Sequence, residues 1–390
     1  MNPAHRILIV AVLLVGLNPL MAQTTTVPPP ARSAKNSQLI LPNIEPVKIE
    51  QLAGGLKSPW SLVFIGKDEI LISEKHGGMR LWRAGTLTPQ VIPGGPPAPL
   101  QISDSGILDI ALDPDFASNR FVYISFVEGD KSANRTAIWK ARWLESKLTD
   151  GRVIFRAKPD KAEAKHPGGR VLFLPDKSLL LTIGDGFQYK AAAQDLGSHL
   201  GKTLRLDTEG RAPADNPFVK TPNALPEIWT YGHRNAQGLA HDAVTGEIWL
   251  HEHGPRGGDE VNLLIAGANY GWPLVTHGID YDGSIISEHA FAAAVQRSSF
   301  VWTPSIAPSG LAVYRGDAFP DWNGKLLVGA LAAKSISRLR KTKSREFLIE
   351  EERMLASLKK RIRDVRVGTD GLIYVLTDSA EGELLRLRPN

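Results

Sequence analysis

His166 and Asp185 have the chemistry of a base and of the carboxylate that orients it, and they flank one apolar stretch of the sequence. An imidazole titrates near neutral pH, and an acidic partner holds its ring in place and raises its basicity. The stretch between them, VLFLPDKSLLLTI, consists of two β-type runs around a turn, so its two ends can meet. The spacing permits a general base with its partner, and equally a loop histidine and an unrelated turn aspartate.

The segment YGHRNAQG concentrates hydrogen-bond donors between two glycines. Its Arg234 and Asn235 carry guanidinium and amide groups, which suit a carboxylate or a set of sugar hydroxyls. A solvated loop would carry such residues as well. The segment alone therefore leaves both a binding site and an ordinary loop open.

The segment HEHGPRGGDEVN, which begins at His251, has oxygen donors of the kind that hard cations prefer. Gly and Pro turns expose backbone carbonyls, so Gly254 and Pro255 are candidate ligands for such an ion. Asp259 and Glu260 either bind a cation or tie the loop together. The two histidines alternate as HxH instead of HExxH, which argues against a zinc protease.

Arg361 and Arg363 stand two residues apart just before the last apolar run. In an extended segment this spacing places both side chains on one side, where two guanidiniums suit an anion with several carboxylates. The neighbouring Lys359 and Lys360 leave a solvated basic edge as the alternative.

Six short apolar runs, each entered by turn residues, would position these four segments. The runs are EILISE, FVYISF, SLLLTI, EIWLHE, KLLVGAL and LIYVLTD. The turns before them recur about every 61 residues, and a β unit repeated at this scale favours an all-β fold, the six-bladed β-propeller. A β-sandwich and a pair of β domains are the alternatives. Loops at one end of a propeller converge on its channel, so distant segments can share a site.

Composition and motifs exclude several classes of function. The 390 residues include no cysteine, which excludes thiolate zinc sites, cysteine nucleophiles and disulfides. The 46 Lys and Arg against 41 Asp and Glu give a formal charge of +5, an excess too small and too dispersed to indicate a nucleic-acid partner. No GxGxxG motif opens a helix after a strand, and neither a P-loop nor a GxSxG motif occurs.

The N-terminus is typical of an export sequence. His5 and Arg6 precede an apolar run over 7–17, and a small residue follows at Ala22. These features predict a signal peptide over 1–22, a disordered leader over 23–38 and a single propeller over 39–390. A membrane span needs roughly 20 apolar residues, and no run reaches that length. We therefore expect a periplasmic protein with no membrane span in the mature chain.

A series of longer motifs covers nearly the whole chain. They are GILDIALDPDF, GKTLRLDTEG, DNPF, YGHRNAQG, EHGPRGGDEVN, NYGWP, RIRDV and DGLIYVLTD. With these motifs in order, the chain resembles the soluble PQQ-dependent aldose sugar dehydrogenases, the glucose/sorbosone dehydrogenase family, from about Leu52 to Leu387. The resemblance implies a six-bladed propeller that holds PQQ and Ca²⁺ above its channel. It also implies oxidation of aldoses at the anomeric C1 hydroxyl to the lactone, with electrons passed to a small or protein acceptor.

The matching motif positions carry the family's functional residues onto this chain. His166 matches the general base that removes the C1 hydroxyl proton before hydride passes to the Ca²⁺-bound quinone, and Asp185 matches its orienting carboxylate. Arg234 matches the arginine that lies over the reacting quinone oxygens. The other matched contacts are Asn235, Ser305, Arg361 and Arg363 toward PQQ, and the carbonyls of Gly254 and Pro255 toward Ca²⁺.

Asp104 and Ala332 depart from the family pattern. Asp104 stands where a glutamine often touches the sugar, and it is expected to hold a sugar hydroxyl instead. A lysine that often contacts PQQ falls on Ala332. Lys334 lies two residues further on, on what is expected to be the same strand face, and is therefore expected to replace it.

Other functions remain open on the same fold. The chain could oxidise another sugar aldehyde such as sorbosone, or it could bind carbohydrate or protein without catalysis. A calcium-dependent hydrolase or lactonase is disfavoured, because the basic residues match a polyanionic quinone. A monomer and a homodimer are both compatible with the sequence.

Overall fold

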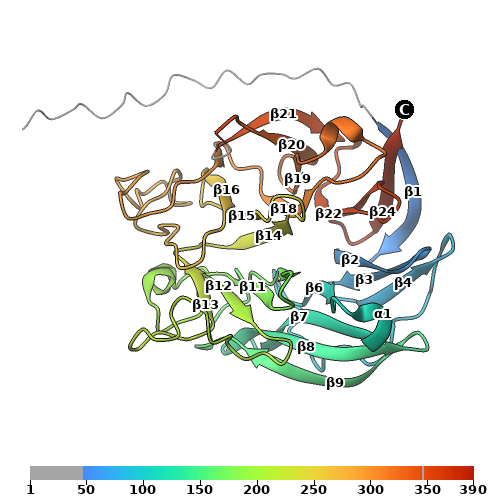
Figure 1. Cartoon of the computed structure of the whole chain (residues 1–390), viewed down its shortest axis with the longest axis horizontal. Helices are drawn as coiled ribbons and strands as arrows, with labels where there is room; N and C mark the ends of the chain where they lie inside the picture. The colour runs from blue at the N-terminus through green and yellow to red at the C-terminus, as the bar shows by residue number, and fades with distance from the viewer. Residues whose placement is uncertain (1–46, 345–346) are drawn as a thin grey trace, which may run out of the picture. The chain divides into compact units, whose positions relative to one another are not determined.

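The computed structural model describes residues 47–344 and 347–390, which form six four-stranded antiparallel sheets arranged as blades in a ring (Figure 1). This arrangement confirms the predicted all-β, six-bladed β-propeller and contradicts the sandwich and the pair of β domains. The predicted signal peptide, the leader and the first residues of the predicted propeller lie outside the described residues. No helix within the described ranges is long and apolar enough to cross a bilayer.

The first three blades follow one another directly along the chain. Blade 1 contains β2 (Pro59–Gly66), β3 (Glu69–Glu74), β4 (Gly78–Arg83) and β5 (Thr86–Leu87). Blade 2 contains β6 (Ile107–Leu112), β7 (Phe121–Gly129), β8 (Asn134–Leu144) and β9 (Lys147–Arg156). Blade 3 contains β10 (Val171–Phe173), β11 (Leu179–Ile183), β12 (Lys202–Leu206) and β13 (Ile228–Tyr231).

The last three blades complete the ring. Blade 4 contains β14 (Ala236–His241), β15 (Ile248–Glu252), β16 (Asp259–Leu263) and β17 (Phe300–Trp302). Blade 5 contains β18 (Pro308–Val313), β19 (Leu326–Ala330), β20 (Ser335–Lys341) and β21 (Leu348–Met354). Blade 6 contains β22 (Ile362–Val367), β23 (Ile373–Thr377), β24 (Gly382–Pro389) and β1 (Val47–Leu56). The connections include the short helices α1 (Phe116–Asn119), η1 (Lys190–Gln194), η2 (Pro320–Trp322) and η3 (Ala356–Leu358).

Strands from both ends of the described chain close the ring. β1 pairs antiparallel with β24, from Val47 opposite Pro389 to Leu56 opposite Gly382. Figure 1 shows this pair at the outer edge of blade 6, while the first strands of the blades surround the centre. A closed ring leaves each blade covered on both faces by its neighbours.

The six predicted apolar runs coincide with the second strand of each blade. These strands are β3, β7, β11, β15, β19 and β23. In β3, Leu71 packs with Ile110 of blade 2, while Ile70 and Ile72 pack with Leu376 of blade 6. Alternate side chains are thus buried against opposite neighbours, and this explains why the runs are continuously apolar instead of alternating.

Four charged side chains join the inner strands at the centre of the ring, three of them buried and the fourth, Arg366, partly buried. Arg170, just before β10, has its Nη1 3.0 Å from Asp364 Oδ1 and 3.5 Å from Asp109 Oδ1. Arg366 contacts the same two carboxylates, each at 2.9 Å. Hydrogen bonds from this group reach three further inner strands at Ser61, Gln237 and Ser309. We call Asp109, Arg170, Asp364 and Arg366 the central ion quartet.

Candidate active site

A cavity of about 410 Å³ lies above the central ion quartet and is lined by residues from all six blades. Most of them stand just before the first strand or just after the second strand of a blade. Because these two strands are antiparallel, the start of one and the end of the other meet at the same face. A volume of this size is typical of a small-molecule site.

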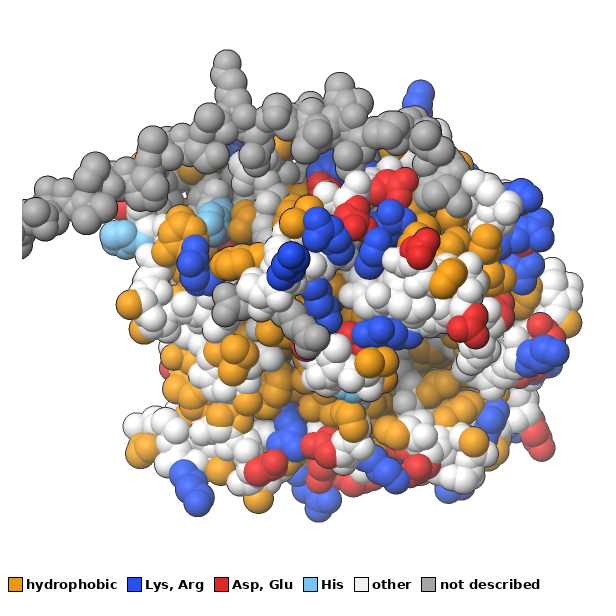
Figure 2. Space-filling view, turned by 45° about the horizontal axis from the view of Figure 1, so that its top comes forward, with side chains coloured by type: hydrophobic (Ala, Val, Ile, Leu, Met, Phe, Trp, Pro, Cys, Tyr) orange, Lys and Arg blue, Asp and Glu red, His pale blue; other side chains and the backbone are white. Residues whose placement is uncertain are grey.

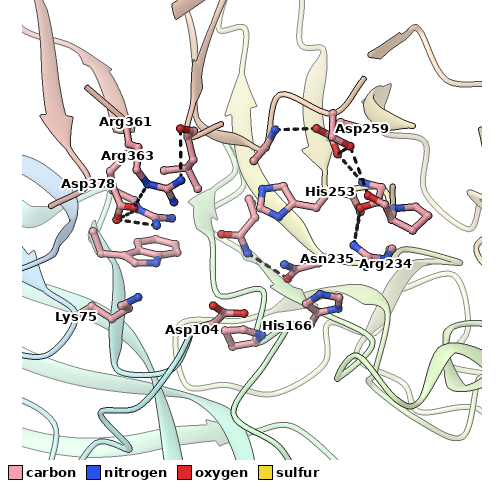
Figure 3. A pocket seen from close by; sticks show the side chains of 18 of the residues that line it. Lys75, Asp104, His166, Arg234, Asn235, His253, Asp259, Arg361, Arg363 and Asp378 are labelled. Atoms are coloured by element: carbon pink, nitrogen blue, oxygen red, sulfur yellow. Dashed lines mark hydrogen bonds and ion pairs between the residues drawn. The ribbon is translucent and has the colours of Figure 1, made fainter. Parts of the chain in front are cut away.

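Nine of the residues predicted to form the site line this cavity. They are Asp104, His166, Arg234, Asn235, Gly254, Pro255, Ser305, Arg361 and Arg363. Asp185 lies directly behind His166 and contacts it. Lys334 is not among the lining residues. Figure 3 shows Arg361 and Arg363 on one side of the cavity, Arg234 on the other, and His166 between them beside Asp104.

His166 and Asp185 are in contact, which is one of the two arrangements that the spacing permits. Nδ1 of His166 lies 2.7 Å from Oδ1 of Asp185. The same oxygen accepts a hydrogen bond from the backbone N–H of Phe187 at 2.8 Å. Oδ2 accepts one from Nε1 of Trp272, also at 2.8 Å. These three donors fix the carboxylate, and Nε2 of His166 is left as the ring nitrogen available to the cavity.

Burial and mutual hydrogen bonding set the protonation state of this pair. Burial lowers the pKa of His166, although the hydrogen bond and charge of Asp185 raise it in part. For Asp185, burial opposes ionisation, but the hydrogen bonds from His166 and Phe187 and the charge of Arg234 act against it, and the pKa is lowered. His166 is therefore neutral at pH 7, with a proton on Nδ1 and a lone pair on Nε2.

A close backbone approach brings the two residues together. His166 has a φ of +48°, and its loop lies against the end of β11. A Cβ at Gly184 would collide with the backbone oxygen of His166, so only glycine fits there. Because Asp185 follows this glycine, the contact places its carboxylate beside the imidazole.

The backbone carbonyls of Gly254 and Pro255 lie on the cavity wall and accept hydrogen bonds. Nη1 of Arg234 donates to Gly254 O at 2.7 Å, and Oγ of Ser305 lies 3.5 Å from Pro255 O. Asp259 accepts hydrogen bonds from Gly254 N at 2.8 Å and from Ser305 Oγ at 3.0 Å. Asp259 thus ties the loop together, which is one of the two roles that the sequence left open for it.

Arg234 is held from several sides. Its backbone N–H donates to Glu252 Oε2 at 2.6 Å, and Nδ1 of His233 lies 2.8 Å from the other oxygen of that carboxylate. Its Nη2 donates to the hydroxyl of Tyr281 at 3.3 Å. The guanidinium carbon lies 5.4 Å from the ring centroid of Trp272, within the range of a cation–π contact.

Asn235 presents its amide donors to the cavity. Its Oδ1 accepts hydrogen bonds from Gly168 N at 3.3 Å and from Gln237 Nε2 at 3.1 Å. The NH₂ group is therefore free to donate to a bound molecule. Arg234 and Asn235 are buried, which contradicts the solvated-loop alternative. Their role as donors to a bound molecule stays a prediction.

Arg361 and Arg363 line the same side of the cavity and share one carboxylate. Nε of Arg361 donates to Asp378 Oδ2 at 2.8 Å, and Nη2 of Arg363 donates to Oδ1 at 2.9 Å. Burial disfavours the charge of Asp378, but Arg363 and Arg361 hold its pKa at about 2. Two guanidiniums against one carboxylate leave this end of the cavity positive.

The expectation for Lys334 rests on a wrong premise. β19 ends at Ala330 and β20 begins at Ser335, so Ala332 and Lys334 lie in a turn and not on a strand face. Alternation by two residues does not hold there, and Lys334 is exposed. The cavity has a different lysine that the sequence did not indicate, Lys75.

Figure 2 shows basic side chains interspersed with acidic ones over the visible part of the described surface. The cations of the cavity are a few lining residues, Lys75, Arg234, Arg361 and Arg363. The signal that could have found Asp378 is its place: it follows the second strand of its blade, as Asp185 follows the second strand of blade 3.

Comparison with known proteins identifies the family. The family model described as Glucose / Sorbosone dehydrogenase matches residues 56–386, and the chain belongs to this family. The aldose sugar dehydrogenase YliI of Escherichia coli is 41% identical over 349 residues, which cover 88% of this chain and 93% of that protein. An uncharacterized protein of Synechocystis is 42% identical over 371 residues, which cover 90% of this chain and 88% of that protein.

Solved structures agree with this assignment. The apo-form of the soluble aldose sugar dehydrogenase from Escherichia coli superposes with a TM-score of 0.84 at 39% identity, covering 88% of this chain and all of that chain. The PQQ-bound form of an aldose sugar dehydrogenase from Streptomyces coelicolor has a TM-score of 0.70 at 27% identity, covering 90% of this chain and 99% of that one.

Proposed function

We propose that this protein oxidises aldose sugars at the C1 hydroxyl to the lactone, with PQQ and Ca²⁺ as cofactors. The observation that carries the proposal is the neutral His166, oriented by Asp185, at the edge of a cavity with cations on both sides. The names of the Escherichia coli and Streptomyces relatives support a sugar substrate, and the PQQ-bound title of the latter supports the quinone.

The cavity wall fits a polyanionic quinone. PQQ carries three carboxylates and an ortho-quinone, so it needs cations and hydrogen-bond donors around a flat body. Arg361 and Arg363 supply the cations at one end, and Arg234 supplies one at the other. The amide of Asn235 lies on the wall between them. Guanidiniums are suited to carboxylates because they donate two parallel hydrogen bonds.

The donor set for Ca²⁺ is incomplete without an anionic ligand. Gly254 and Pro255 offer two carbonyl oxygens, which are the hard donors that Ca²⁺ prefers. Within the described residues, no three His, Asp or Glu side chains gather as a metal site. We therefore infer that Gly254 and Pro255 would hold Ca²⁺ only together with a further anionic ligand, such as a carboxylate-bearing cofactor.

The chain's own residues move and hold the substrate proton. A bound quinone would supply the two-electron acceptor for the hydride of the C1–H bond, and Ca²⁺ would supply Lewis acidity. Nε2 of His166 takes the C1 hydroxyl proton, and Asp185 stabilises the imidazolium that forms. Asp104, on the cavity wall beside His166, is placed to hold another sugar hydroxyl.

The test is reconstitution of the purified apo-protein. PQQ and Ca²⁺ are added, and sugar-dependent reduction of an artificial dye is followed with aldoses and with sorbosone. We expect PQQ absorbance and turnover with at least one aldose. Absence of both would contradict the enzyme, and PQQ binding without turnover on any sugar would favour a non-catalytic propeller. His166→Ala should retain PQQ and lose about 10²–10⁴-fold in rate.

We also propose export to the periplasm, on the predicted signal peptide that ends at Ala22. N-terminal sequencing of the protein recovered from a cell envelope fraction should then begin after this residue. A mature protein that still starts at Met1 would contradict the proposal.

A further inference from the structure

Lys75 enters the cavity from the end of β3, and its backbone is fixed there. Its N–H donates to Ser58 O at 2.9 Å, and its carbonyl accepts a hydrogen bond from Ile107 N at 3.1 Å. A Cβ at Gly106, whose φ is +152°, would collide with that carbonyl and with Cγ of the lysine. Glycine at this position therefore lets the chain that enters blade 2 pack directly against the backbone and side chain of Lys75.

The ammonium of Lys75 differs from the other cations of the cavity. Within the described residues, no hydrogen bond or ion pair joins its Nζ to an acceptor, although the side chain is partly buried. Each of the three lining arginines has one: Arg234 donates to Gly254 O, and Arg361 and Arg363 donate to Asp378. An unpaired cation at a partly desolvated position is a binding group for an anion.

The carboxylates that face Lys75 do not satisfy it. Burial and the charge of Arg363 lower the pKa of Lys75, while Asp378 and Asp104 raise it. Both oxygens of Asp378 are already taken by arginines. Asp104 lines the same cavity but forms no ion pair with the lysine. Figure 3 places Lys75 on the side of Arg361, Arg363 and Asp378, opposite Arg234.

We propose that Lys75 binds a carboxylate of the cofactor at the arginine end of the cavity. It thereby takes the role that the sequence assigned to Lys334. The inference rests on the proposed function, because it assumes PQQ as the occupant. The alternative source of a carboxylate, an acidic sugar bound as substrate, is separated from it by the measurements below.

The experiment is a titration of the apo-protein with PQQ in the presence of Ca²⁺, followed by quenching of tryptophan fluorescence. The variants are Lys75→Met, Lys75→Arg and, as the matched comparison, Lys334→Met. We expect Lys75→Met to raise the Kd about 10- to 150-fold, the size of one hydrogen bond between charged groups. Lys75→Arg should recover most of the affinity, and Lys334→Met should stay within about twofold of the wild type.

Each result decides the matter. An unchanged Kd in Lys75→Met, or a loss confined to Lys334→Met, overturns the proposal. A normal PQQ affinity with a raised KM for the sugar places Lys75 against the substrate and overturns it as well. If the wild type itself binds no PQQ, the proposed function fails first. Thermal unfolding accompanies each variant, and Lys75→Gln replaces Lys75→Met if the methionine variant does not fold.

Discussion

Replacement of Asp185 by Asn should separate the charge of this residue from its shape. The carboxylate accepts from His166 and Phe187 at Oδ1 and from Trp272 at Oδ2. An amide has one oxygen and one NH₂ group, so it cannot accept on both sides. Either the indole N–H of Trp272 loses its acceptor, or His166 changes tautomer and carries its proton on Nε2.

The size of the effect follows from the bond that is lost. His166 becomes a cation only as it takes the substrate proton, so Asp185 stabilises the transition state more than the ground state. A buried hydrogen bond to a charged group contributes about 1.5–3 kcal/mol, which corresponds to a loss of about 10- to 150-fold in kcat. If the tautomer changes, Nε2 cannot accept a proton, and the loss extends toward about 10²–10⁴-fold.

The assay is the pH dependence of kcat in the PQQ- and Ca²⁺-loaded protein. In the wild type, kcat should rise with pH through the pKa of His166, which burial places below the ordinary value of 6.5. Asp185 raises that pKa, so Asp185→Asn should move the acid limb to lower pH while the plateau falls. Asp282→Asn, on an exposed loop, is the matched control. A plateau near the wild-type value with an unmoved acid limb would refute the role of the pair.

Three further predictions follow from single contacts. Arg361→Ala should weaken PQQ retention in equilibrium dialysis, because it removes a cation from the positive end of the cavity; an unchanged affinity would count against the pairing. Arg170→Met should lower the free energy of unfolding in urea by about 3–5 kcal/mol, because it leaves two buried carboxylates to one guanidinium, and a change below about 1 kcal/mol would be inconsistent with this. Asp104→Gln should raise kcat/KM for glucuronate relative to glucose roughly 5-fold or more, since it removes a negative charge near the substrate; an unchanged ratio would place Asp104 away from the sugar.

The propeller was predictable because one strand of each blade is buried on both faces. The second strands, such as β3 with Ile70 and Leu71, pack against two neighbouring blades and therefore appear as continuous apolar runs with a regular spacing. The first strands are harder to recognise. They surround the channel and carry residues such as Asp109 and Asp364, whose partners come from other blades.

Contacts within one blade could be inferred from the sequence, whereas contacts between blades could not. His166 and Asp185 flank one strand pair, so their meeting follows from local sequence. Lys75 and Asp378 stand after second strands of different blades, and they share a cavity only because β1 and β24 close the ring. No spacing within the sequence encodes their shared place on the cavity wall. Lys334 was misplaced because the strand period was carried into a turn.

Irregular strand pairing in the inner strands directs several side chains into the cavity. The register of the first strand shifts near its start in five blades, at β2, β6, β14, β18 and β22. The extra residue is Trp60 in β2, Gln237 in β14 and Arg363 in β22, and each of these three lines the cavity. A bulge redirects a side chain that regular alternation would place elsewhere.

The residue after the bulge in β22 is Asp364, which belongs to the central ion quartet. Arg170 of the same quartet lies 4.1 Å from the ring centroid of Trp60, the extra residue of β2. Arg363 therefore faces the cavity because it is the extra residue of a bulge, next to Asp364 of the central ion quartet. The sequence placed Arg361 and Arg363 on the same side by regular strand alternation. Both do line the cavity, but the alternation is interrupted at Arg363.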